Sequence, residues 1–235
     1  LAQKYNTLSI LDGVCSVAGE EINQDEWGLD VVLTGSQKAI GVPPGLALLI
    51  ASQKAMKVWE NRKTPVCNYY ADWNNWLPIM RAYEERKPAY FGTPPVNLIV
   101  ALETSLKMIC QEGMSVRVKR HQNLAKAFRA GISALDLETI PKSNNIAANT
   151  LSAVYYPKGV DGSALLSKMS NNDVIIAGGL LPEIKTSYFR VGHMGSVSSS
   201  DLMKVLDALE RALFELGHHI VPGKALQSFQ NTVIF

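Results

Sequence analysis

Short, mostly apolar segments separated by turn residues dominate the first fifty positions of the chain. They cover residues 8–11, 29–33 and 46–51, and Asp-Gly and Thr-Gly-Ser turns follow the first two. Segments of this length, with apolar residues on both faces, are typical of strands buried within an α/β sheet. The pattern therefore predicts three strands, followed by a helix over residues 52–62 with Ser52 as its N-cap.

From residue 96 onward, helical spacing replaces this pattern. Leu98, Leu102 and Leu106 recur every four residues, which predicts a helical segment over residues 96–135 that Gly113 breaks into two helices. Beyond it, the alternation of apolar and polar positions predicts strands at 151–156, 173–177 and 188–192, a short helix at 162–171 and an amphipathic helix at 198–216.

Residues 63–93 separate the two patterns and are rich in aromatic side chains. We expect an irregular connection there, and one of this length is usually functional. The chain is thus predicted to contain part of an α/β domain over residues 1–95, a smaller α+β domain over 96–217 and a tail over 218–235. The first thirteen residues resemble the end of a helix that runs into a strand, so we expect an N-terminal part to be absent.

Composition narrows the class of protein. The 235 residues are 47% hydrophobic with a net charge of +2, which excludes wholesale disorder and argues against nucleic acid or an anionic membrane as partner. The three cysteines lie far apart, which argues against a disulfide framework or a structural zinc site and favours an intracellular, reducing compartment. The last three residues are not a Ser-Lys-Leu signal, so cytoplasm, peroxisome and mitochondrion all remain open.

Three charged residues are candidates for chemistry. Asp12 ends the first predicted strand and Lys38 follows the second, so both lie at one edge of the sheet if these strands are parallel. Pyridoxal phosphate needs such a pair, because a lysine binds its aldehyde and a carboxylate keeps its pyridine nitrogen protonated. Arg190, inside a predicted strand, suits a substrate carboxylate. The alternatives are a turn-forming Asp12, a solvated Lys38 and an Arg190 held in an internal ion pair.

Four motifs, in this order and spacing, resemble those of class V aminotransferases of fold type I. They are DGVCS at 12–16, GSQKA at 35–39, YFGTPP at 90–95 and FRVGHMG at 189–195. The chain is most similar to the alanine–glyoxylate (serine–pyruvate) aminotransferase group, especially its fungal members, from residue 8 to about residue 215. The resemblance implies the C-terminal portion of the pyridoxal phosphate-binding large domain, followed by the small domain.

The resemblance also implies roles for individual residues around the cofactor. Lys38 would form the Schiff base and Asp12 would bind the pyridine nitrogen. Val14 would pack on one face of the ring, and Gln37 would lie beside the phosphate.

The remaining implied roles concern the dimer and the substrate. Tyr90 and Thr93 would reach the phosphate from the neighbouring subunit of a homodimer, and Arg190 would anchor the substrate carboxylate. The implied reaction is transamination between alanine or serine and glyoxylate or pyruvate.

Members of this family carry a further N-terminal segment with a Gly-rich phosphate loop and a ring-stacking aromatic residue. Neither is in this chain, so we expect the full-length parent to be the enzyme and this chain alone to be inactive, with apolar sheet surface exposed. A lyase or cysteine desulfurase that uses Cys67 is an alternative, although Gln37 replaces the histidine usual there. A non-catalytic fragment that only dimerises is another. His193 and Cys15 are expected to serve packing.

Overall fold

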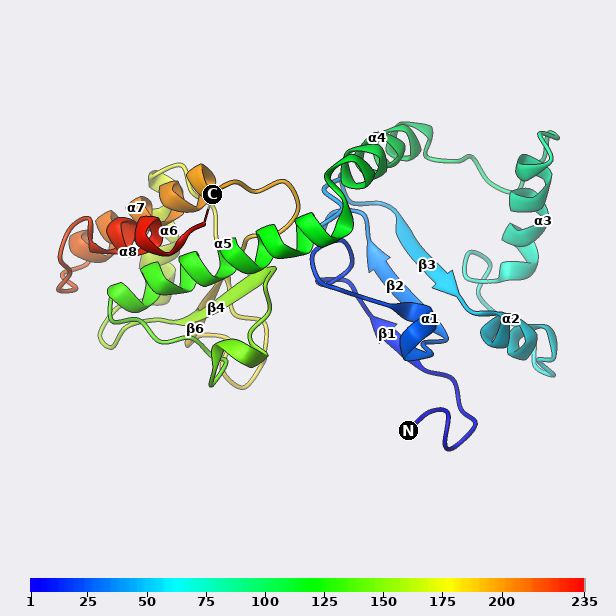
Figure 1. The fold of residues 1–235 in the computed structure, drawn as a ribbon, viewed down its shortest axis with the longest axis horizontal. Helices are drawn as coiled ribbons and strands as arrows, with labels where there is room; N and C mark the ends of the chain where they lie inside the picture. The colour runs from blue at the N-terminus through cyan, green and yellow to red at the C-terminus, as the bar shows by residue number, and fades with distance from the viewer. Residues whose placement is uncertain (235) are drawn as a thin grey trace.

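The computed structural model describes residues 1–234, which form two lobes that meet where helices α4 (Val96–Glu112) and α5 (Met114–Ala134) join (Figure 1). The first lobe contains a sheet with strand order β1-β2-β3, in which β1 and β2 are parallel and β3 is antiparallel. These strands are β1 (Ile10–Asp12), β2 (Val31–Gly35) and β3 (Ala47–Ala51), and the helices around them are α1 (Gln24–Trp27) and α2 (Gln53–Glu60). All three strands were predicted, with shifts of one or two residues at their ends.

A buried carboxylate fixes the beginning of this sheet. Asp30, just before β2, accepts hydrogen bonds from the Ser9 backbone N–H at 2.9 Å and the Ser52 hydroxyl at 3.2 Å. Its ion pair with Lys54 of α2 is also 3.2 Å long. These contacts, with the Ser9 N–H foremost, hold the pKa of Asp30 below its ordinary value. One side chain therefore ties β1, β2 and α2 together.

The segment between α2 and α4 is more regular than its sequence indicates. Residues 63–93 contain a helix, α3 (Trp73–Glu84), so the prediction of an irregular connection is wrong there. Asp72 is the N-cap, because its carboxylate accepts a hydrogen bond from the Asn74 N–H at 3.0 Å. Pro78 lies inside the helix and, with the mixed aromatic and polar composition, obscures the helical period.

The second lobe packs helices against a small antiparallel sheet with strand order β4-β6-β5 (Figure 1). Its elements are α5, a 3₁₀ turn (Asn144–Ile146), β4 (Leu151–Tyr155), α6 (Gly162–Asn171), β5 (Ala177–Gly178), β6 (Tyr188–Gly192), α7 (Ser199–Glu215) and α8 (Lys224–Thr232). Helix α4 belongs to the first lobe and leads into α5. The break between α4 and α5 at Gly113 is confirmed, and its φ of +81° suits glycine.

The strand predicted at residues 173–177 is wrong over most of its length. Asp173 has a φ of +58° and its N–H donates to the Ser170 carbonyl, so the chain turns as it leaves α6. Only Ala177 and Gly178 pair with β6. Val174 and Ile176 instead pack against the core from a non-strand segment, and periodicity alone does not distinguish these two arrangements.

Helix α5 and helix α8 build the core of the second lobe. Phe128 and Ile132 of α5 pack in one buried cluster with Ala225 and Phe229 of α8. Glu210 of α7 accepts hydrogen bonds from the backbone N–H groups of Gly223 at 2.7 Å and Ala225 at 2.8 Å, and so caps the start of α8. No element was predicted in residues 218–235; the proposed domain divisions at residues 95 and 217 stay predictions.

Apolar surface remains exposed on the first lobe, as the sequence predicts. Ile10 of β1 is 66% exposed and Ile50 of β3 is 64% exposed. By contrast, Leu98 and Leu102 of α4 pack on a second buried cluster with Ile40, so α4 covers the segment after β2. Among residues 1–234, no helix is both long enough and apolar enough to cross a bilayer.

Candidate active site

The first two strands bring two of the predicted residues to one sheet edge. Asp12 is the last residue of β1, and Lys38 lies three residues after β2 ends at Gly35. Because β1 and β2 are parallel, both residues follow carboxyl ends of neighbouring strands. Lys38 is half-buried, and its amine makes no hydrogen bond or ion pair within residues 1–234. The amine is therefore available to a ligand.

The contacts of Asp12 fit both a turn-forming aspartate and a carboxylate that binds a ligand. Its Oδ1 accepts a hydrogen bond from the Val14 N–H at 3.0 Å, which is the contact of a turn-forming aspartate. The side chain is exposed, and Oδ2 has no hydrogen-bond donor within the described residues. One carboxylate oxygen thus shapes the turn that carries Val14, while the other remains free for a ligand.

The loop that carries Lys38 is held by its own polar contacts. The fully buried Ser36 hydroxyl donates to the Pro43 carbonyl at 2.8 Å and accepts from the Leu46 N–H at 3.3 Å. The Gly41 N–H donates to the Lys38 carbonyl at 2.9 Å. Gln37 is exposed beside Lys38. The contacts of Ser36 make this short loop a rigid support for Lys38.

Arg190 lies in β6, the central strand of the second sheet, opposite Ala153 and Ala177. Its Nε donates to the Gly178 carbonyl at 2.8 Å, and no acidic side chain pairs with it within residues 1–234. The alternative of an internal ion pair is therefore absent there. The backbone contact orients the guanidinium and leaves its two terminal nitrogens free to bind an anion.

His193, three residues after Arg190, is a packing residue, as expected. It is fully buried; its Nδ1–H donates to the Asn149 carbonyl at 3.1 Å, and its Nε2 accepts from the Ser152 hydroxyl at 2.9 Å. Burial lowers the pKa of His193 to about 4, so the imidazole is neutral at pH 7. The side chain of Cys15 is half-buried.

Tyr90 and Thr93 form a pair by themselves. Their hydroxyl groups lie 3.1 Å apart, and Tyr90 is 74% exposed. Within residues 1–234, neither side chain makes a hydrogen bond to Asp12 or Lys38. Beside them, Phe91 packs at the centre of an aromatic cluster with Tyr69, Tyr70 and Trp76. Cys67 is exposed in the preceding loop.

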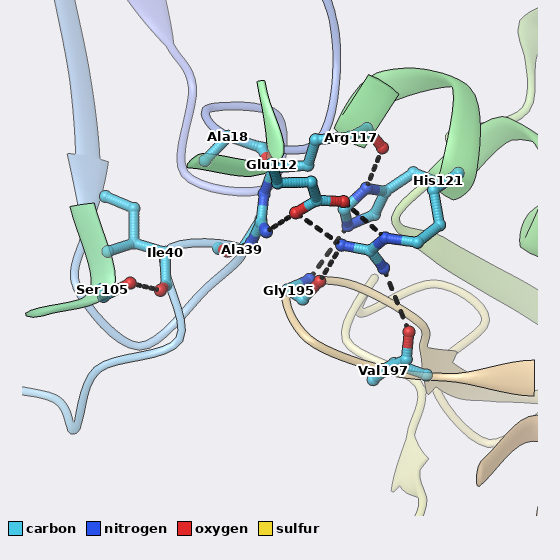
Figure 2. Close-up of polar contacts among 10 residues, drawn as sticks. Ala18, Ala39, Ile40, Ser105, Glu112, Arg117, His121, Gly195 and Val197 are labelled. Carbon is cyan, nitrogen blue, oxygen red and sulfur yellow. Dashed lines mark hydrogen bonds and ion pairs between the residues drawn. The ribbon is translucent and has the colours of Figure 1, made fainter. Parts of the chain in front are cut away.

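A group of buried and half-buried titratable residues lies where the two lobes meet, and no sequence motif predicted it (Figure 2). Glu112, at the end of α4, accepts from Arg117 Nη1 at 2.6 Å and from Arg120 Nε at 2.7 Å. These contacts, with the Arg120 hydrogen bond foremost, lower the pKa of Glu112. We call Glu112, Arg117, Arg120 and His121 the junction cluster.

Backbone carbonyl groups occupy the remaining donors of the two arginines. Arg117 donates to Ala18 at 2.8 Å and to Ala39 at 2.6 Å, and Ala39 directly follows Lys38. Arg120 donates to Gly195 at 2.9 Å and to Val197 at 3.1 Å. The cluster therefore holds the segments after β1, β2 and β6.

His121 completes the junction cluster in its neutral form. Its Nδ1–H donates to the Arg117 carbonyl at 2.8 Å, so Nε2 accepts the Gly195 N–H at 3.0 Å. Burial is the main cause that lowers the pKa of His121 and keeps this acceptor available. Arg117, Arg120 and His121 share one face of α5 at spacings of three and four residues. This spacing, on a helix that packs against the core, is the sequence signal that could have identified them.

The chain was compared with known protein families and structures. Residues 1–193 match the family model of class V aminotransferases. The chain belongs to the class V aminotransferase family. The predicted resemblance and the α/β fold class are both confirmed.

Individual relatives carry related names. The alanine–glyoxylate aminotransferase 1 of Saccharomyces cerevisiae is 38% identical over 193 residues, which are 80% of this chain and 49% of the yeast protein. The serine–glyoxylate aminotransferase of Arabidopsis thaliana is 32% identical and covers 95% of this chain and 54% of its own length. The crystal structure of pyridoxamine–pyruvate aminotransferase from Mesorhizobium loti superposes with a TM-score of 0.89 at 29% identity, over 98% of this chain and 58% of that one. The chain thus spans about half the length of the curated relatives it matches.

Proposed function

We propose that the whole protein containing this chain catalyses pyridoxal phosphate-dependent transamination between a small amino acid, alanine or serine, and a small 2-oxo acid, glyoxylate or pyruvate. The observation that carries the proposal is the pair Asp12 and Lys38 after the ends of two neighbouring parallel strands. The names of the relatives support the reaction class and the choice of small substrates.

The donor set fits the cofactor. A half-buried amine without a partner, a carboxylate with one free oxygen and a guanidinium with free terminal nitrogens are the groups that this chemistry requires. Bound pyridoxal phosphate would supply an aldehyde that accepts the amino group and a ring that accepts electrons. The residues proposed to hold it are Lys38, Asp12, Val14, Gln37, Tyr90 and Thr93.

Each protein group has a defined task in the proposed reaction. Arg190 binds the substrate carboxylate and fixes which bond to the substrate Cα is weakened, and this choice favours loss of a proton over loss of carbon dioxide. The Lys38 amine removes that proton as a general base and returns it as a general acid. Asp12 would hold the pyridine nitrogen, and its negative charge would favour the protonated form of that nitrogen.

We further propose a homodimer in which Tyr90 and Thr93 complete the phosphate site of the partner subunit. The exposed hydroxyl pair supports this, because two hydroxyl groups 3.1 Å apart can both turn their hydrogens toward a phosphate group that binds beside them. The adjacent exposed rings of Tyr69 and Tyr70 provide apolar surface for such an interface.

Reductive labelling of the whole protein tests the lysine assignment. Borohydride reduction with bound cofactor should attach a pyridoxyl group to the peptide that contains Lys38. Lys38→Arg keeps the positive charge but cannot bind the aldehyde, so turnover should be lost entirely. Lys126→Arg, the same substitution at an exposed position of α5, should leave turnover unchanged. A label on another lysine, or turnover of Lys38→Arg near the parent level, would rule the proposal out.

A further inference from the structure

Three segments that carry or adjoin the proposed catalytic groups converge on the junction cluster. They are the turn after β1, the residue after Lys38 and the segment after β6, and α4 and α5 supply the charged side chains between them (Figure 2). Ser105 of α4 adds a hydrogen bond to the Ile40 carbonyl, two residues beyond Lys38. The same helices therefore hold backbone from both lobes.

On the side of the first lobe, Arg117 binds the backbone of the residue that follows Lys38. Its Nη2 contacts the Ala39 carbonyl and its Nε contacts the Ala18 carbonyl, while its side chain is almost fully buried. A planar guanidinium with three occupied nitrogens has a single favourable orientation. That orientation fixes the position of the Ala39 carbonyl and hence the direction in which the chain leaves Lys38.

On the side of the second lobe, Arg120 and His121 hold Gly195, five residues after Arg190. Arg120 binds the Gly195 carbonyl and His121 accepts the Gly195 N–H, so both polar groups of that residue are fixed. Gly195 also lies against the first lobe, since a Cβ atom at this position would be 3.4 Å from the Ala39 carbonyl oxygen. The backbone after Lys38 and the backbone after Arg190 thus touch at one place.

Glu112 makes the two halves of the cluster interdependent. Its carboxylate binds both arginines, so its removal leaves the two guanidinium groups without an oppositely charged partner. We propose that Glu112, Arg117 and Arg120 are positioning residues that set the separation between the Lys38 amine and the Arg190 guanidinium. This inference rests on the proposed transamination, in which one substrate must reach both groups at once. A misplacement of about 1 Å costs up to roughly 100-fold in rate.

The test compares two glutamates in the whole protein. Glu112→Gln removes the charge that joins the arginines. Glu210→Gln is the control, since the Glu210 carboxylate also joins two segments, but neither of them carries Lys38 or Arg190. Hydrogen–deuterium exchange without cofactor is measured for residues 36–42 and 193–198. With cofactor, kcat, KM for the amino acid and the pH dependence of the bound cofactor's visible absorption are measured.

We expect Glu112→Gln to speed exchange in both segments together, to shift the pH dependence of the absorption, and to lower kcat/KM by about 10- to 100-fold. Glu210→Gln should lower the melting temperature without these changes. Arg120→Lys retains the charge and serves as a milder variant; it should speed exchange at 193–198 and raise KM more than it lowers kcat, whereas Arg117→Lys should act mainly at 36–42 and on kcat.

Two results would overturn the inference. One is unchanged exchange at both segments in Glu112→Gln and Arg120→Lys, and the other is equal effects of Glu112→Gln and Glu210→Gln on exchange and kinetics. An unmodified protein that performs no transamination would instead refute the proposed function. In that case, the exchange measurements would still decide whether the cluster fixes the two segments.

Discussion

Acid should destabilise this protein through His193 in particular. In the unfolded chain, a histidine takes up a proton as the pH falls below about 6.5, whereas burial holds the pKa of the folded His193 at about 4. Between these values only the unfolded state binds the proton, so stability is lost as the pH falls from 7 to 4 and no further below that. The difference between the two pKa values, at about 1.4 kcal/mol per pH unit, gives a loss of roughly 3 kcal/mol.

The substitution His193→Gln isolates this contribution. Glutamine does not titrate, and its amide can still hydrogen-bond to the Asn149 carbonyl and the Ser152 hydroxyl. Free energies of unfolding from urea titrations at pH 7, 6, 5 and 4 would be compared for both proteins. Carboxylates and His121 titrate in both, so they cancel in the difference. The parent should lose about 3 kcal/mol more than the variant between pH 7 and pH 4. A difference between the proteins that stays constant with pH would refute the reasoning.

Two further predictions concern the proposed cofactor site. Asp12→Asn removes the charge beside the pyridine nitrogen and should reduce turnover by several powers of ten, at about 1.4 kcal/mol for each, with cofactor still bound; a loss below tenfold in steady-state assays would leave Asp12 as a turn residue only. Tyr90→Phe combined with Thr93→Ala should weaken cofactor affinity and should reduce dimer stability only when cofactor is present, because the two equilibria are linked. Dimer dissociation titrated with and without pyridoxal phosphate measures this, and an identical cofactor dependence in mutant and parent would contradict a shared site.

Regular local signals in the sequence predicted regular local structure. The helix at 162–171 has the predicted bounds, and the serine-rich start of α7 forms a capping box through Ser198 and Asp201. Where the signals conflict, the predictions are wrong. Pro78 inside α3 argues against a helix in the sequence, although the helix forms. The apolar residues after Asp173 have the composition of a strand, although the chain turns at Asp173.

The candidate site also contains residues that the sequence predicted and residues that it did not. Asp12 and Lys38 are identifiable because strand ends mark ligand sites, and the parallel pairing that joins them is confirmed. The junction cluster depends instead on contacts between Arg117 and carbonyl groups 78 and 99 positions earlier in the chain. No local pattern contains such distances, and only the folded backbone brings these groups together.

The junction cluster lies near the first turn of α5. A rotation of the helix about this point moves its far end much more than it moves the cluster. Helix α5 extends from there into the second lobe, and Ile132, fifteen residues beyond Arg117, is roughly 22 Å away along the axis. A tilt of about 5° around the cluster would swing Ile132 and the core packed on it by about 2 Å, but would move the guanidinium of Arg117 by well under 1 Å. The position of the core of the second lobe relative to Lys38 therefore depends on the contacts at the start of α5, because any change in the angle of the helix there is enlarged along its length.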